Sequence, residues 1–175
     1  MKIDPELNEI SQYVLAKMNE AGLKVATAES CTGGLVSALL SSIAGSSSVF
    51  ERGFVTYSNE AKCEQLGVDN ELIDEFGAVS SQVAMAMAAG ALDNSNANIS
   101  VSITGIAGPD GGSEEKPVGL VYIAIAGPEG MFVEELKFGN LGRHEIRSQS
   151  AIAALEMLVA FGLSDDEEDE AGSVH

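Results

Sequence analysis

The chain has 175 residues, of which 45% are hydrophobic, and its formal net charge is −18 at pH 7. This length fits one domain with a sizeable core, and so acidic a surface repels DNA and RNA over most of its area. Because no apolar run of about 18 residues is present, we expect no membrane-spanning helix. The first six residues lack a basic patch followed by an apolar core, which argues against a signal peptide and favours the cytoplasm.

Turn and capping residues divide the chain into alternating helices and strands. Asp4 before Pro5 predicts a helix start, and Gly22 predicts its end. The later expected elements are a strand over 24–28, a helix from 35 to 43, a loop at 45–48, a strand over 53–57, helices over 59–66 and 69–76, an Ala/Met-rich helix over 83–92, strands over 99–104, 118–126 and 132–138, and a helix over 143–161. This order predicts a layered α/β fold with a mixed β-sheet covered by helices, because the last strands follow one another directly.

The C-terminal end differs in composition from the rest of the chain. Residues 165–170 are six consecutive acids, and almost no apolar side chain follows them. We therefore divide the chain into one domain, residues 1–163, and an acidic tail, residues 164–175, which we expect to be disordered.

Cysteine and histidine are rare, which narrows the chemistry that the chain can carry. Cys31 and Cys63 are the only cysteines, and we expect free thiols because we expect a cytoplasmic chain. Their spacing also matches no zinc pattern. His144 and His175 are the only histidines, so a His-rich metal site is not expected. A Ser-His-Asp triad would depend on His144, which no other feature supports.

The turn between the strand over 24–28 and the next helix carries Ser30, Cys31, Thr32, Gly33 and Gly34. We expect Ser30 near a helix N-terminus, where unpaired backbone N–H groups and the helix dipole favour a phosphate or an oxyanion. The alternative is that Ser30 or Thr32 only caps the helix and that the two glycines only form the turn.

A second glycine-rich segment, residues 104–112, connects two expected strands. It lacks the Lys-Ser or Lys-Thr of a P-loop, and a dinucleotide fingerprint would open a helix instead. Its glycines permit close approach of the backbone to a ligand, which makes Thr104 and Gly105 candidate binding residues. The alternative is a long surface turn.

A serine nucleophile needs a group that accepts its proton. Tyr57 ends an expected strand, and Lys62 lies about one turn into the next helix. A desolvated lysine can act as a base near neutral pH, although Lys62 is alternatively a solvated helix residue and Tyr57 a residue at the core edge. Cys31 is an alternative nucleophile beside Ser30, and we expect only one of the two to be used.

Two arginines open the last expected helix. Arg143 and Arg147 lie four residues apart, so they would share a helix face and can hold one phosphate together. The alternative is surface pairing with Glu145 or with the acidic tail.

Together, these segments resemble the family of the C-terminal domain of CinA, the competence/damage-inducible protein, which also occurs alone as nicotinamide-nucleotide amidohydrolase. The family usually has Gly-Asp-Arg where this chain reads Leu141-Gly142-Arg143, so the choice between Arg143 and Arg147 stays open. The matching stretches, within roughly residues 20–160, are AESCTGGLVSALL, GSSSVFERGFVTYSNEAKCEQLGV, FGAVSSQVAMAMAAGAL, VSITGIAGPDGGSEEKPVGLVYIAIA and GRHEIRSQSAIAAL.

The resemblance implies an amidohydrolase that deamidates nicotinamide mononucleotide to nicotinic acid mononucleotide and ammonia, without metal or cofactor. It implies Ser30 as nucleophile, Tyr57 and Lys62 beside it, and an arginine on the phosphate. Backbone N–H groups around Gly33–Gly34 or Gly105 would hold the oxyanion. The alternative is a non-catalytic nucleotide-binding or regulatory module of the CinA type, which needs the same loops. We expect a small-molecule nucleotide as ligand and no nucleic-acid or membrane partner, and a homo-oligomer stays open.

Overall fold

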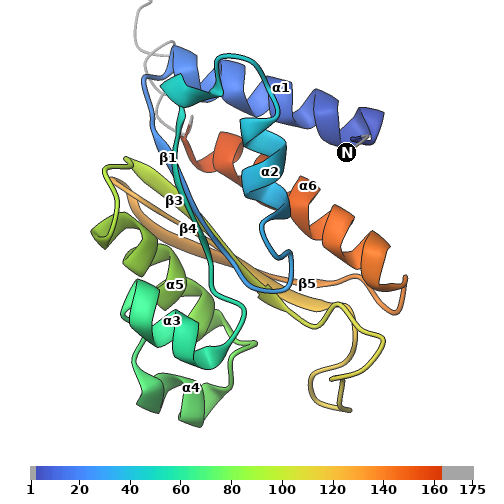
Figure 1. Ribbon diagram of the computed structural model, residues 1–175. Coiled ribbons are helices and arrows are strands. Elements are labelled where there is room, and N and C mark those ends of the chain that lie inside the picture. The colour runs from blue at the N-terminus through green and yellow to red at the C-terminus, as the bar shows by residue number, and fades with distance from the viewer. Residues whose placement is uncertain (1–2, 163–175) are drawn as a thin grey trace, which may run out of the picture.

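The computed structural model describes residues 3–162, which form a β-sheet with helices on both faces (Figure 1). Within this range the sheet has five strands in the order β2-β1-β3-β4-β5. The first three strands of that order run parallel, and β4 and β5 are antiparallel to their neighbours. This confirms the predicted layered α/β fold with a mixed sheet. The strands are β1 (Val25–Glu29), β2 (Phe50–Val55), β3 (Ile99–Gly105), β4 (Leu120–Gly127) and β5 (Gly130–Lys137).

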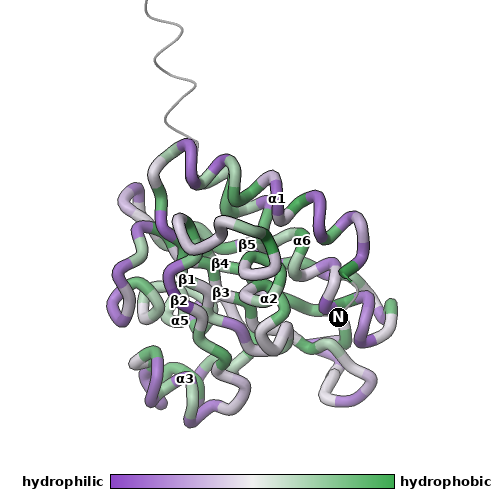
Figure 2. Tube along the Cα trace, turned by 45° about the horizontal axis from the view of Figure 1, so that its top comes forward, coloured by the Kyte–Doolittle hydropathy of each residue, from purple (hydrophilic) through white to green (hydrophobic). Residues whose placement is uncertain are grey.

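The helices divide between the two faces of the sheet (Figure 1). One face carries α1 (Pro5–Glu20), α2 (Leu35–Ser41) and α6 (Arg143–Gly162), and the other carries α3 (Asn59–Leu66), α4 (Asn70–Phe76) and α5 (Ser81–Asp93). Apolar residues therefore gather along the central strands, and hydrophilic ones alternate with them along the outer helix α1 (Figure 2). In the described range, no helix combines the length and apolarity that a membrane crossing requires.

Capping side chains mark where four of the described helices begin, including the predicted start at Asp4. Each accepts a hydrogen bond from a backbone N–H in the first helical turn, which satisfies a group that has no partner within the helix. The caps are Asp4 for α1, Ser58 for α3, Asp69 for α4 and Ser80 for α5.

The edge strand β2 differs most from its prediction. It spans Phe50–Val55 rather than 53–57. Pairing with β1 sets its bounds, and the pattern of apolar and polar residues within the strand does not. Tyr57 consequently lies beyond the strand. Residues 46–48, predicted as loop, form a short 3₁₀ helix, η1 (Ser46–Ser48). The predicted acidic tail, residues 164–175, lies outside the described residues.

Candidate active site

The candidate site lies where the three parallel strands end. Ser30 follows β1, Thr56 follows β2, and Gly105 is the last residue of β3. The Ser30 N–H donates to the Ile103 carbonyl at 2.9 Å, and the Thr56 N–H donates to the Glu29 carbonyl at the same distance. These bonds hold the three strand ends side by side, and the carboxyl edge of parallel strands is where open α/β sheets bind ligands.

Lys62 reaches this edge from α3 and contacts the predicted nucleophile. Its Nζ lies 3.0 Å from Ser30 Oγ, 2.9 Å from the Thr56 carbonyl oxygen and 3.5 Å from the Ser58 carbonyl oxygen. The side chain is only 1% exposed, so the interpretation of Lys62 as a solvated helix residue is wrong. Burial lowers the pKa of the Lys62 amine from its ordinary value.

The three contacts of Lys62 suit a base. A neutral amine has two N–H bonds and one lone pair. When the N–H bonds donate to the carbonyls of Thr56 and Ser58, the lone pair points at the Ser30 hydroxyl and accepts its proton. The geometry of a nucleophile within hydrogen-bond reach of an oriented base is therefore present before any substrate binds.

A pocket of about 280 Å³ opens beside this pair. It brings together six of the predicted site residues: Ser30, Tyr57, Lys62, Thr104, Gly105 and Arg143. The sequence analysis missed Asn59, Ala78, Val79 and Asp110, which also line it. Of these four, only Asp110 could have been predicted from the sequence, because it lies in the glycine-rich segment.

Arg143 spans the mouth of the pocket. One guanidinium nitrogen donates to Tyr57 Oη at 2.7 Å, and another donates to the Gly108 carbonyl at 2.8 Å. Because the Tyr57 oxygen accepts this bond, its own O–H is available to a ligand. Tyr57 is 58% exposed, so it stands at the rim and not in the core edge. The glycine-rich segment is consequently part of the pocket wall and not only a surface turn.

The backbone of Gly105 packs too closely for any side chain. A Cβ there would lie 2.7 Å from Val121 Cγ2 and 2.9 Å from the Leu120 carbonyl oxygen. Thr104, in contrast, turns its hydroxyl into the fold, where it donates to the Ala78 carbonyl at 2.8 Å. Of these two residues, only Gly105 presents backbone to the pocket without a competing side chain.

Glu29 was missed by the sequence analysis, and its position corrects one expectation. Its fully buried carboxylate accepts the N–H groups of Val36 and Ser37 at 2.8 and 3.0 Å, and the Ser37 hydroxyl at 2.7 Å. The expectation of free N–H groups at the N-terminus of α2 is therefore wrong, because the preceding strand supplies its own anion. The N-cap is Gly34, so neither Ser30 nor Thr32 caps α2.

Cys31 contributes to the wall of the Lys62 pocket, but Thr32, Gly33 and Gly34 do not. Thr32 is fully buried, and the Gly33 N–H donates to the Ser30 carbonyl at 3.0 Å. Gly33 and Gly34 have φ values of +60° and +95°, a backbone conformation that favours glycine. These residues shape the turn that carries Ser30.

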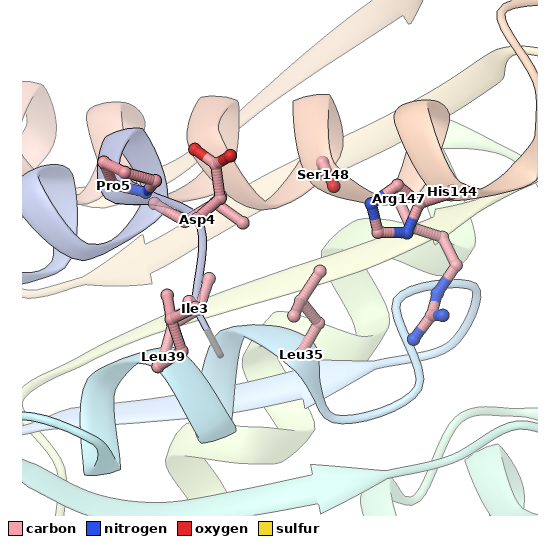
Figure 3. A pocket seen from close by; sticks show the side chains of 9 residues that line it. Ile3, Asp4, Pro5, Leu35, Leu39, His144, Arg147 and Ser148 are labelled. Atoms are coloured by element: carbon pink, nitrogen blue, oxygen red, sulfur yellow. The ribbon is translucent and has the colours of Figure 1, made fainter. Parts of the chain in front are cut away.

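Arg147 lies apart from Arg143. It lines a larger cavity, about 600 Å³, between the start of α1, α2 and the start of α6 (Figure 3). Its guanidinium donates to the Thr32 carbonyl at 2.7 Å. The two arginines therefore line different pockets, which argues against the prediction that both hold one phosphate. The larger cavity contains no nucleophile paired with a base, so we assign chemistry to the smaller one.

Cys31 does not have the properties of a reactive thiol. Its side chain is buried in the core between the sheet and α1, α2 and α6. Burial raises the pKa of the Cys31 thiol to about 12, so the thiol is protonated at neutral pH. Within residues 3–162, no group of three His, Cys, Asp or Glu side chains is arranged to hold a metal ion.

The arrangement has known relatives. A family model of the CinA C-terminal domain matches residues 7–161. The chain belongs to the CinA C-terminal domain family. A crystal structure of the competence/damage inducible protein CihA from Agrobacterium tumefaciens has a TM-score of 0.88 and 51% identity, and the match covers 91% of this chain and 98% of that one.

Two curated relatives differ in how much of their length the chain spans. It is 49% identical over 155 residues to nicotinamide-nucleotide amidohydrolase PncC of Escherichia coli K12, covering 89% of this chain and 94% of PncC. It is 48% identical over 166 residues to a CinA-like protein of Acidobacterium capsulatum, covering 90% of this chain and 40% of that protein. The chain likewise spans only 37% of two further relatives.

Proposed function

We propose that this CinA-family chain is a nicotinamide-nucleotide amidohydrolase with Ser30 as its nucleophile. The observation that carries the proposal is the 3.0 Å contact between the buried Lys62 amine and Ser30 Oγ in an open pocket. The likeness to PncC, which extends over 94% of that enzyme, supports nicotinamide mononucleotide as substrate. We expect the reaction to take place in the cytoplasm.

The reaction begins with the neutral Lys62 amine. As Ser30 Oγ attacks the carboxamide carbon, Lys62 Nζ takes the hydroxyl proton, and a tetrahedral intermediate forms. Lys62 then gives that proton to the leaving nitrogen, the C–N bond breaks, and ammonia departs. A water molecule, activated by the again neutral Lys62, hydrolyses the resulting ester and releases nicotinic acid mononucleotide. The Ser30 hydroxyl is thereby restored.

Binding divides between the charged and the neutral parts of the substrate. We assign the phosphate to Arg143, whose guanidinium stands at the pocket mouth beside the exposed Tyr57 hydroxyl. We assign the oxyanion to the backbone at Gly105, because the Gly33 N–H already donates to the Ser30 carbonyl. Thr104 supports this wall through its bond to Ala78, and residues 32–34 support the turn.

The decisive experiment supplies nicotinamide mononucleotide to the purified full chain. Ammonia is followed by a coupled glutamate dehydrogenase assay, and nicotinic acid mononucleotide by chromatography; we expect equimolar release. Ser30→Ala should abolish release while calorimetry still detects nucleotide binding. Binding to the wild-type chain without any turnover would overturn the proposal in favour of a non-catalytic nucleotide-binding module.

A further inference from the structure

Arg147 contacts the turn of Ser30 from a cavity separate from the Lys62 pocket. Its side chain descends from the first turns of α6 past the cavity walled by Leu35, Leu39 and Pro5 (Figure 3). There it donates to the carbonyl of Thr32, two residues after Ser30. Arg147 is absent from the walls of the pocket that holds Lys62.

We propose that Arg147 is a positioning residue, which fixes the Thr32 carbonyl and so keeps Ser30 Oγ aligned with Lys62 Nζ without touching the substrate. This proposal rests on the proposed function, because the alignment of Ser30 Oγ with Lys62 Nζ matters only if the two groups hydrolyse an amide.

The turn of Ser30 needs a contact from outside the turn to restrain its downstream half. Its upstream end is held by the bond from the Ser30 N–H to Ile103 in β3. Downstream come Gly33 and Gly34, the residue type with the greatest backbone freedom. The Thr32 carbonyl is the last group before them, and it accepts from the Leu35 N–H at 3.1 Å as well as from Arg147. Without Arg147, the Thr32 carbonyl keeps only the bond from the Leu35 N–H, and the Glu29 carboxylate holds the chain only beyond the two glycines, at Val36 and Ser37.

The surroundings of Arg147 argue against a role in stability alone. Its Nε is buried and has no hydrogen-bond partner within the described chain. The side chain also forms no ion pair with residues 3–162. A buried donor without a partner destabilises the fold, and an apolar side chain beside Leu35 and Leu39 would avoid that cost. The benefit of the arginine therefore lies in the carbonyl that it holds.

The test compares Arg147→Met with Arg147→Lys and with a control, Arg52→Met. Arg52 also donates to a backbone carbonyl, that of Asn94 at 2.6 Å, but it lines neither cavity. Because a misplacement of about 1 Å can cost about 100-fold in rate, we expect kcat of Arg147→Met to fall about 10- to 100-fold, with KM within about twofold of wild type. Arg147→Lys keeps a donor and should recover part of kcat, and Arg52→Met should leave both constants unchanged.

A second measurement works without turnover. Hydrogen exchange in peptides spanning residues 30–36 should quicken in Arg147→Met and not in Arg52→Met, while exchange in β4 stays constant. If wild type fails to deamidate the nucleotide, the proposed function fails but exchange still tests the positioning. A raised KM with unchanged kcat would assign Arg147 to the phosphate. Unchanged exchange in residues 30–36 would show that Arg147 does not restrain the turn. Either result overturns the proposal. If Arg147→Met does not fold, Arg147→Lys carries both measurements.

Discussion

Replacing Lys62 by methionine is the sharpest test of the proposed chemistry. Methionine retains an unbranched, buried side chain but removes the amine that contacts Ser30 Oγ and the Thr56 carbonyl. General-base catalysis is worth about 10²–10⁴ in rate, so kcat/KM of Lys62→Met should fall about 10³-fold, or about 4 kcal/mol of transition-state stabilisation. KM should change little, because the phosphate is assigned to Arg143, whose hydrogen bonds are to Gly108 and Tyr57 and not to Lys62.

The same variant makes a prediction about stability. Burial lowers the pKa of Lys62 in the folded chain below 10.5, whereas the unfolded chain keeps the ordinary value. Between these two pKa values the unfolded state binds more protons, so wild-type stability rises with pH. Lys62→Met lacks this dependence. The free energy of unfolding of the variant minus that of wild type should therefore become smaller as pH rises from 7 towards 10, by about 1.4 kcal/mol for each unit of the pKa difference crossed.

Two measurements check this reasoning. Urea unfolding at several pH values gives the stability difference, and the ammonia assay gives kcat/KM, which in wild type should rise with pH to a midpoint below the ordinary pKa of lysine. Lys17→Met, on the exposed side of α1, serves as control and should leave both profiles unchanged. A wild-type rate profile that tracks an ordinary lysine, or a stability difference independent of pH, would refute the buried neutral base.

Other substitutions separate the remaining roles. Arg143→Met should raise KM about 10- to 100-fold with a smaller change in kcat, since it removes a charged partner of the phosphate; a normal KM would remove Arg143 from phosphate binding. Tyr57→Phe should lower kcat/KM by about 10-fold through one lost hydrogen bond, and an unchanged rate would reduce Tyr57 to packing. Cys31→Ala should keep kcat within a few-fold of wild type, and iodoacetamide at pH 7 should not inactivate through Cys31, whose pKa of about 12 keeps the thiol protonated; inactivation traced to Cys31 by mass spectrometry would contradict this.

The fold was predictable where local rules decide it. Asp4 before Pro5 predicts the start of α1, because capping is a contact between neighbours in sequence. The bounds of β2 were not predictable, because an edge strand takes its register from its partner, here β1. The order of strands follows from packing between distant segments, and composition does not encode it locally.

The sequence predicted several residues that meet in the candidate site, but less of how they are arranged. Ser30 and Lys62 were found from a strand-to-helix turn and from the need for a base without histidine. Two contacts depend on tertiary structure alone: the Glu29 carboxylate on the N-terminus of α2, and Arg147 on Thr32. A spacing of four residues places Arg143 and Arg147 along one helix, but the two side chains contact different segments. Arg143 donates to Gly108 and Tyr57, whereas Arg147 donates to Thr32 in the turn of Ser30.

Under the proposed function, an acidic chain has to bind a substrate that carries a phosphate. The formal charge of −18 opposes a phosphate at long range, but two guanidinium cations lie near Ser30: Arg143 lines its pocket, and Arg147 donates to the Thr32 carbonyl. The Glu29 carboxylate at the same turn is satisfied by the N-terminus of α2, which offsets its charge locally. The substrate carries a pyridinium cation and a neutral amide, whereas the product carries a carboxylate in place of the amide. The protein's field thus opposes the product more than the substrate, so deamidation itself favours release from the pocket.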